Sequence, residues 1–381
     1  MPAIGWASKK NKLTYGLGVF GQGGMGTEFA ATSFLAKGTG DVVRSEVGVG
    51  RAMIPVTYDV NDQFVIGGSF DFVWAGMDVK MALTGQEFGD MISTLGGTQS
   101  QGRASGTMVD GMVAMMPGMI GGVNWARFDF SNGSDFTGEA RGYGVAGKIG
   151  MVYKVNPTFT VGATYHSRTN LGDLETDNAT VTMNALVDVT NSSGPYTAMT
   201  IPVKGKIAVK DFQWPETYGI GIAYKPTDKL MLAFDVKRIM WSNVMEDFNM
   251  AFTAYPAAQQ AGLAQGFGGS QLNATLDQKW DDQTVFSMGA AYRVTKAVVV
   301  RAGYNYASNP IPDTYLNALF PAIEESHVTA GLGYSFSENS GLDFALSKAL
   351  NVVAANPNPF GEPVISDHDQ WSGQLMYTYR Y

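Results

Sequence analysis

The sequence has 381 residues, of which 45 % are hydrophobic and only 16 % are charged, with 47 glycines and a formal net charge of −8. Ordinary soluble domains carry about 25 % charged residues, so this composition is closer to that of a membrane protein. The negative charge argues against a nucleic-acid partner, and the lack of cysteine excludes disulfides and zinc–cysteine sites. No apolar run reaches the ~18 residues of a transmembrane helix. A membrane-spanning chain of this composition has to pair its backbone in a closed β-barrel.

The glycine-rich segment between Phe20 and Phe29 is the first irregular feature of the chain. Consecutive glycines interrupt strand pairing, so we expect a bulge or gap here. The residues concerned are Gly21, Gln22, Gly23, Gly24, Met25 and Gly26. From the residues alone, a flexible junction between strand and loop explains the segment slightly better.

The connection Asp78–Thr137 is predicted to be a long outer loop with short helices at Gln86–Leu95 and Thr107–Ile120. The second helix is rich in methionine, whose flexible side chain fits varied apolar ligands. We therefore predict a ligand groove in which Leu263 and Phe267, from the loop Ala251–Ala274, form the opposite wall. The alternative is that the methionines only pack the loop. The methionines are Met108, Met112, Met115, Met116 and Met119.

Later in the chain, period-two alternation predicts one antiparallel strand after another. In 217–224, Tyr218, Ile220 and Ile222 alternate with small residues, and the same pattern recurs in 230–237, in 328–336 and in the segment that ends at Tyr381. Aromatic residues stand at the ends of the apolar faces, and short polar turns alternate with long connections. Both features are typical of membrane barrels. We predict an all-β transmembrane antiparallel barrel of about thirteen strands, formed as one domain by residues 1–381.

Three stretches of the sequence resemble the FadL-type family (OmpP1/FadL/TodX), which transports long-chain fatty acids or aromatic hydrocarbons across Gram-negative outer membranes. They are Tyr58–Phe72, Pro215–Trp241 and Trp280–Pro312, the last of which continues into His327–Phe336. The resemblance implies fourteen strands and an N-terminal plug called the hatch. Residues 1–10 lack the apolar stretch of a signal peptide. We therefore expect that the signal, the hatch and the first strand precede Met1.

The resemblance also implies facilitated diffusion of a hydrophobic small molecule, with lateral release into the membrane beside a kinked strand. It places this lateral gate at Gly21, Gly23 and Gly24. It implies contact with outer-membrane lipid and lipopolysaccharide, and a monomer without cofactors. Fatty acids and aromatic hydrocarbons both remain possible ligands. A carboxylate ligand needs a cation, and alternation points five of them into the lumen: Lys148, Arg168, Lys237, Arg293 and Arg301. Asp71, Asp235 and Asp343 point inward too, so these charges could instead pair with each other.

Three other functions were weighed against transport of hydrophobic compounds. A general water-filled porin is the main alternative, although the long loop lacks the charge cluster of a porin constriction. A structural or adhesive barrel is the second. An enzyme is not expected, because the three histidines, His166, His327 and His368, have no nucleophile motif and no metal-ligand spacing.

Overall fold

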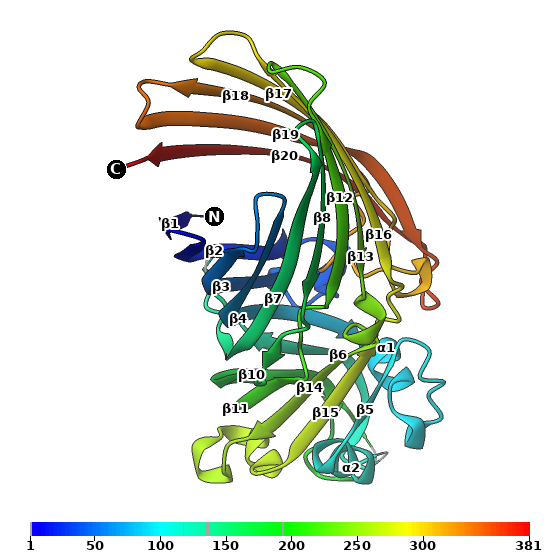
Figure 1. Ribbon diagram of the computed structural model, residues 1–381. Coiled ribbons are helices and arrows are strands. Elements are labelled where there is room, and N and C mark those ends of the chain that lie inside the picture. The colour runs from blue at the N-terminus through cyan, green and yellow to red at the C-terminus, as the bar shows by residue number, and fades with distance from the viewer. Residues whose placement is uncertain (1, 117, 135–136, 193) are drawn as a thin grey trace.

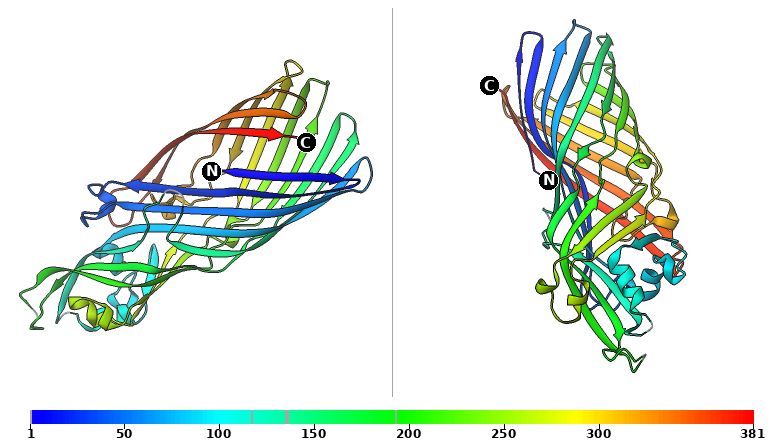
Figure 2. Two further views of the ribbon diagram at one scale, coloured as in Figure 1. Left: turned by 90° about the vertical axis from the view of Figure 1, so that its left-hand side faces the viewer. Right: turned by 90° about the horizontal axis from the view of Figure 1, so that it is seen from below.

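The computed structural model describes residues 2–381 except 117, 135–136 and 193. Within this part of the chain, thirteen antiparallel strands lie side by side and form a curved wall (Figures 1 and 2). This number agrees with the prediction. In order around the wall the strands are β1 (Ala3–Lys10), β2 (Leu13–Phe29), β3 (Val43–Asp59), β4 (Phe64–Thr84), β7 (Ala140–Asn156), β8 (Phe159–His166), β12 (Thr217–Tyr224), β13 (Leu230–Ile239), β16 (Gln283–Arg293), β17 (Val298–Ala307), β18 (Ser326–Ser335), β19 (Ser340–Asn356) and β20 (Val364–Tyr379).

The two ends of the wall, β1 and β20, share no backbone pairing among the described residues. A hydrogen bond from the Trp6 indole to the Tyr381 hydroxyl links β1 to the C-terminal end of the chain. Every other pair of neighbours in the wall is joined by a regular antiparallel ladder, with three local irregularities in register.

The alternation in sequence gives the wall two different faces. The apolar residues that we predicted for the lipid side are exposed on the outside, as in Ile220 at 58 % and Leu375 at 68 %. The opposite positions of the same strands, such as Gly219 and Gly221, pack against Lys237 and Asp235 on the inner side. Large apolar side chains that stay exposed along whole strands require a nonaqueous surrounding, because each buried CH₂ contributes about 0.8 kcal/mol.

Strand β4 belongs to two sheets at once. Residues 64–77 pair with β7 in the wall, whereas residues 79–84 pair with β6. From β6 the sheet continues as an extension beyond the wall, in the lower half of Figure 1, through β10, β11, β14, β15 and β5. The bounds of these strands are β5 (Gly102–Ser105), β6 (Ile120–Phe130), β10 (Leu174–Val187), β11 (Thr197–Lys210), β14 (Asp247–Ala254) and β15 (Gln271–Asp277). The two-residue strand β9 (Asn170–Leu171) pairs with β7.

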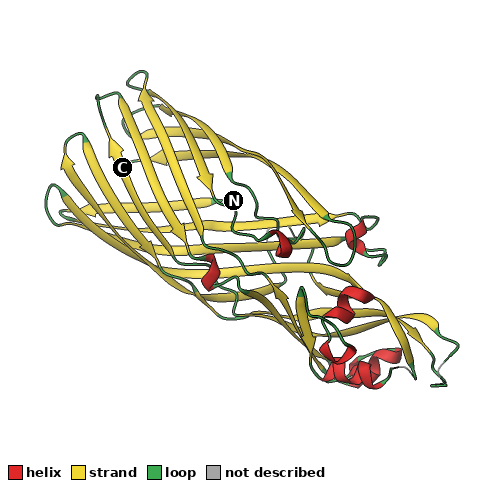
Figure 3. Ribbon diagram, turned by 90° about the vertical axis from the view of Figure 1, so that its right-hand side faces the viewer, coloured by secondary structure: helices red, strands yellow, loops and turns green. Residues whose placement is uncertain are grey.

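Both α-helices lie beside the extension (Figure 3). The first, α1 (Gly85–Asp90), begins with a capping box in which Thr84 Oγ1 accepts from the Glu87 amide and the Glu87 carboxylate accepts from the Thr84 amide. The second, α2 (Thr107–Ala114), is shorter than predicted and ends before Pro117, since a proline disfavours helical backbone in the residue before it. No helix among the described residues could span a membrane. Short 3₁₀ turns lie at Phe34–Ala36, Ser93–Leu95, Trp241–Asn243, Ala257–Gln259, Gly262–Phe267 and Asp313–Tyr315.

The predicted outer connections contain more strand than the sequence indicated. Asp78–Thr137 holds the outer end of β4, all of β5 and all of β6 besides its two helices, and Ala251–Ala274 includes the ends of β14 and β15. These strands pair with one another in the extension, where one face of β10, β11 and β14 is buried and the other is partly or fully exposed.

Candidate functional site

A β-bulge interrupts β2 at Gln22. Gly21 pairs with Gly50 of β3, but Gly23 pairs with Val49, so Gln22 is the extra residue. A bulge shifts the alternation by one position. Leu17 therefore faces outward before the bulge, and Met25 faces the interior core after it. The irregularity lies at the glycines that the sequence singled out as a gate.

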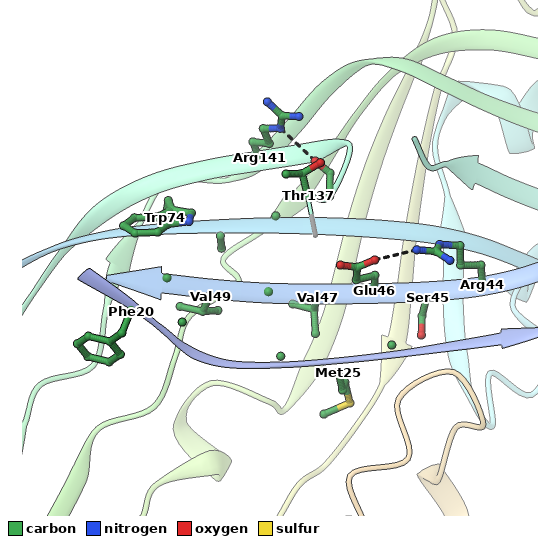
Figure 4. A pocket seen from close by; sticks show the side chains of 18 of the residues that line it. Phe20, Met25, Arg44, Ser45, Glu46, Val47, Val49, Trp74, Thr137 and Arg141 are labelled. Atoms are coloured by element: carbon green, nitrogen blue, oxygen red, sulfur yellow. Dashed lines mark hydrogen bonds and ion pairs between the residues drawn. The ribbon is translucent and has the colours of Figure 1, made fainter. Parts of the chain in front are cut away.

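Outside the bulge, glycines form the floor of a hollow in the wall. Gly24, Gly48 and Gly76 are direct neighbours across β2, β3 and β4, and the Trp74 ring lies over Gly50. The hollow has a volume of about 1030 Å³ (Figure 4), and we call it the outer groove. It is lined by Pro2, 19–21, 24–28, 44–50, 74–76, Thr137, Gly138, Arg141 and Tyr143.

Charged side chains border the outer groove at one end. Arg44 Nη1 lies 2.8 Å from Glu28 and Arg44 Nη2 lies 2.8 Å from Glu46. Figure 4 shows the ion pair between Arg44 and Glu46 on β3, and Met25 on β2 points away from this pair. Glycine, valine and tryptophan make up most of the rest of the groove, so its floor is apolar and its end is polar.

Inside the bulge lies a second cavity, which we call the chamber. It has a volume of about 70 Å³, and none of its lining residues is charged. Trp241 is its centre, because this ring meets Trp214 edge-on at 5.5 Å and Trp280 edge-on at 5.2 Å. The lining residues are Gly24, Met25, Val47, Met77, Val79, Met81, Phe212, Trp214, Trp241, Met245, Phe248, Met250, Leu276, Gln278, Trp280, Asn317, Leu319 and Phe320.

A third cavity, which we call the entrance cavity, lies between the chamber and the outer loops. Its volume is about 170 Å³, and its lining includes Lys37 and Glu87, whose charges pair at 2.9 Å. It shares the wall residues Met81, Leu276, Gln278, Asn317 and Leu319 with the chamber. The chamber in turn shares Gly24, Met25 and Val47 with the outer groove. The three cavities thus form a series that leads from the loops, through an apolar interior, to the outside of the wall.

Buried charges hold the bulge from the inner side. The Gln22 carboxamide accepts a hydrogen bond from Arg51 Nε, and Arg51 Nη1 lies 2.7 Å from Asp71. Both members of this ion pair are at most 1 % exposed. Asp71 also accepts from Ser69 Oγ at 2.6 Å, and Lys148 Nζ lies 3.9 Å away. Because a buried charge is tolerated only with its partners, this network fixes the side chain of the bulged residue.

The predicted lumen cations do not reach the chamber. Lys148 is tied to Asp71 and lies over the Phe20 ring at 5.3 Å. Arg301 pairs with Asp343 at 2.7 Å on the inner face, and Lys237 packs beside Gly219 there. Arg293 ends β16, and Arg168 is exposed between β8 and β9. These positions favour pairing within the lumen over contact with a ligand.

The predicted methionine groove has a different setting from the one we expected. Met108 and Met112 are buried in the main hydrophobic core, and Phe267 is buried there as well. The remaining residues of the set, Met115, Met116, Met119 and Leu263, pack against this core. None of the seven lines the three cavities. Packing of the loop explains their positions.

The chamber residues were missed in the sequence because they come from distant segments. Trp214, Trp241 and Trp280 each lie just beyond the outer end of a strand, outside the alternating pattern. A tryptophan at such a junction, where it belongs to neither face of the sheet, is the signal that could have indicated them. His368 pairs with Glu324 at 2.7 Å, and no group of three potential metal ligands occurs in the part of the chain that the structure describes.

A β-wall with an apolar exterior and a series of internal cavities is the architecture of an outer-membrane transport barrel. Over residues 1–357 the chain matches the family described as outer membrane protein transport protein (OMPP1/FadL/TodX), and it belongs to this family. Its members are outer-membrane transport channels, not enzymes. The resemblance noted in the sequence is therefore confirmed.

Solved structures of toluene transporters are similar over the whole chain. The P. putida toluene transporter TodX is 25 % identical, with a TM-score of 0.77, and the match covers 100 % of this chain and 82 % of that one. The Ralstonia pickettii toluene transporter TbuX is 26 % identical with a TM-score of 0.73, covering 100 % and 81 %. A Pseudomonas aeruginosa FadL homologue shares the fold at 15 % identity and a TM-score of 0.62, covering 97 % and 76 %. No curated protein matches the sequence.

Proposed function

We propose that this protein carries uncharged monoaromatic hydrocarbons across the outer membrane, through the chamber and out beside the bulge into the lipid. The observation that carries the proposal is the chamber itself, whose lining of tryptophan, methionine and phenylalanine holds no charged side chain. Similarity to transporters named for toluene supports the same ligand class.

The chamber favours aromatic hydrocarbons over long-chain fatty acids for two reasons. A carboxylate taken from water into an apolar cavity needs a charged or hydrogen-bonding partner, and the cations of the lumen are paired elsewhere, as with Lys148 and Arg301. The volume of about 70 Å³ is also far below the ~300 Å³ of a pocket for a drug-sized ligand. A compact ring suits this space better than an extended acyl chain.

Lateral release through the wall is the route that we infer for the ligand. The chamber and the outer groove share Gly24, Met25 and Val47 in their linings, and the bulge lies beside these residues. A hydrocarbon that leaves here passes from one apolar surrounding to another. A route down the lumen would expose it to charged residues such as Asp235, Arg301 and Asp343.

Uptake by cells that carry this chain as their sole hydrocarbon channel tests both the proposed ligand class and the proposed lateral route. We expect saturable uptake of ¹⁴C-toluene and no gain in ¹⁴C-oleate uptake over cells without the chain. Deletion of Gln22 would make the β2–β3 register continuous, and we expect it to abolish toluene uptake while the barrel still folds. Oleate uptake without toluene uptake would overturn the ligand class. Undiminished toluene uptake after the deletion would overturn the lateral route.

A further inference from the structure

The Trp214 indole lies directly against the bulge from the chamber side. A Cβ atom built on Gly23 would lie 2.7 Å from Trp214 Cη2 and 2.8 Å from Cζ2, so the ring occupies the space that any other residue at position 23 would need. Trp214 also lines the chamber. Its ring therefore stands between the chamber and the place where the wall is irregular.

The backbone of Trp214 is anchored, whereas its ring is held by packing. Its amide donates to Thr169 Oγ1 at 2.7 Å, and its carbonyl accepts from the Thr169 amide at 3.0 Å. The residue belongs to the segment 211–216 between β11 and β12, which has no regular secondary structure. The ring meets Trp241 edge-on and is only partly buried. Rotation about the side-chain torsions can thus move the indole while the chain stays in place.

The opposite side of this contact is rigid. Gln22 is hydrogen-bonded to Arg51, and Arg51 is paired with Asp71 in a buried network. Breaking such a network is costly, so the bulge does not open by itself. The backbone of the bulge, held by this network, and the rotatable Trp214 ring therefore meet at Gly23.

We propose that Trp214 is the movable inner cover of the lateral opening: its indole closes the bulge at Gly23 and swings aside to let a ligand pass from the chamber to the outer groove. This proposal rests on the lateral route proposed above. Trp214 is then a gating residue, distinct in role from Trp241 and Trp280, which line the chamber but supply none of the three atoms nearest to a Cβ atom built on Gly23.

A single introduced cysteine tests the cover directly, because the chain contains none. Met250 lines the chamber but not the outer groove. In Met250→Cys protein reconstituted in liposomes, the labelling rate by a maleimide dissolved in the lipid reports access from the membrane to the chamber. We expect Trp214→Ala to raise this rate roughly tenfold, since the ring loses its edge-to-face and Gly23 contacts. Trp214→Phe should give an intermediate rate.

Trp280→Ala is the matched control, because it removes an equal ring from the same chamber away from the bulge. It should leave the labelling rate of Met250→Cys unchanged. Heat-modifiable gel mobility, together with labelling of a lipid-facing Leu332→Cys, checks that every variant is folded. Equal rates with and without Trp214, or an equal rise in Trp280→Ala, would overturn the proposal. Failure of the unaltered chain to take up toluene would instead overturn the proposed function, whatever the labelling shows.

Discussion

At the scale of single residues, charge is kept out of the chamber and concentrated beside it. Arg51 and Asp71 are buried on the inner side of the bulge, whereas the chamber a few residues away carries no charge. The two surroundings depend on each other. The charged network shapes the strand, and the shape of the strand brings the apolar chamber next to the outer groove.

The buried ion pair should contribute strongly to stability. Asp71→Asn leaves the Arg51 charge without its partner, and we expect a loss of about 3 kcal/mol in the free energy of unfolding. The matched variant Asp343→Asn breaks the Arg301 pair, whose side chains are 46 % and 32 % exposed, and should cost below about 1 kcal/mol. Urea titration in lipid vesicles measures both. Similar losses for the two variants would contradict a special role of the buried network.

Among the elements, strands that follow strict alternation were predictable and the irregular ones were not. The faces of β12 were correct because the apolar side chains of Tyr218, Ile220 and Ile222 are all exposed on the same outer face. A bulge at the glycines of β2 was one of two interpretations of the sequence. The extension was not predictable, because most of its strands pair across long separations in the sequence. The chamber likewise depends on three tryptophans that no local pattern connects.

The hairpin of β10 and β11 ends in a loop that is organised by one carboxylate. Asp188 accepts hydrogen bonds from the Thr190 hydroxyl and from the amides of Thr190, Ser192 and Gly194. These donors, that of the Thr190 hydroxyl first, hold the pKa of Asp188 well below its ordinary value. The carboxylate therefore orders the loop above its unfolded pKa, and this effect is lost only as the pH falls through the lower folded value.

Hydrogen exchange of the Thr190, Ser192 and Gly194 amides should follow this linkage. We expect their protection to be the same at pH 5 and pH 3, because a carboxylate whose pKa lies well below its ordinary value stays charged at both. Asp188→Asn should lower protection at both pH values by about tenfold, as expected when hydrogen bonds to a charged acceptor are weakened. Protection in the unaltered loop that already falls at pH 3 would show that the pKa is not depressed.

For the whole molecule, the sequence was sufficient for the β-wall and its apolar outer face but not for the proposed path through it. The wall strands, their number and their lipid face follow from alternation. The path depends on where a bulge, a 3₁₀ turn and three loops meet in space, which alternation does not encode. Two of the predicted cations illustrate this limit, since the sequence did not indicate that Lys148 pairs with Asp71 or that Arg301 pairs with Asp343.

Electrical conductance distinguishes this path from a water-filled pore. In a planar bilayer we expect no large, steady current from the purified chain, because ions avoid a chamber that is apolar and uncharged. A general porin of known conductance, inserted under the same conditions, is the control. Stable large openings would favour the porin alternative over hydrocarbon transport.

The shift of alternation at Gln22 has a consequence for any mutational map of β2. Up to the bulge, odd-numbered positions such as Leu17 should tolerate only apolar substitutions, since they face the membrane. From Gly24 onward the even-numbered positions face outward instead. Odd-numbered positions such as Met25 then face the chamber, where substitutions should affect the transported ligand. In a mutational scan of β2, the pattern of tolerated substitutions would therefore shift by one position near Gln22. The position of this shift would locate the proposed lateral opening from mutational data alone.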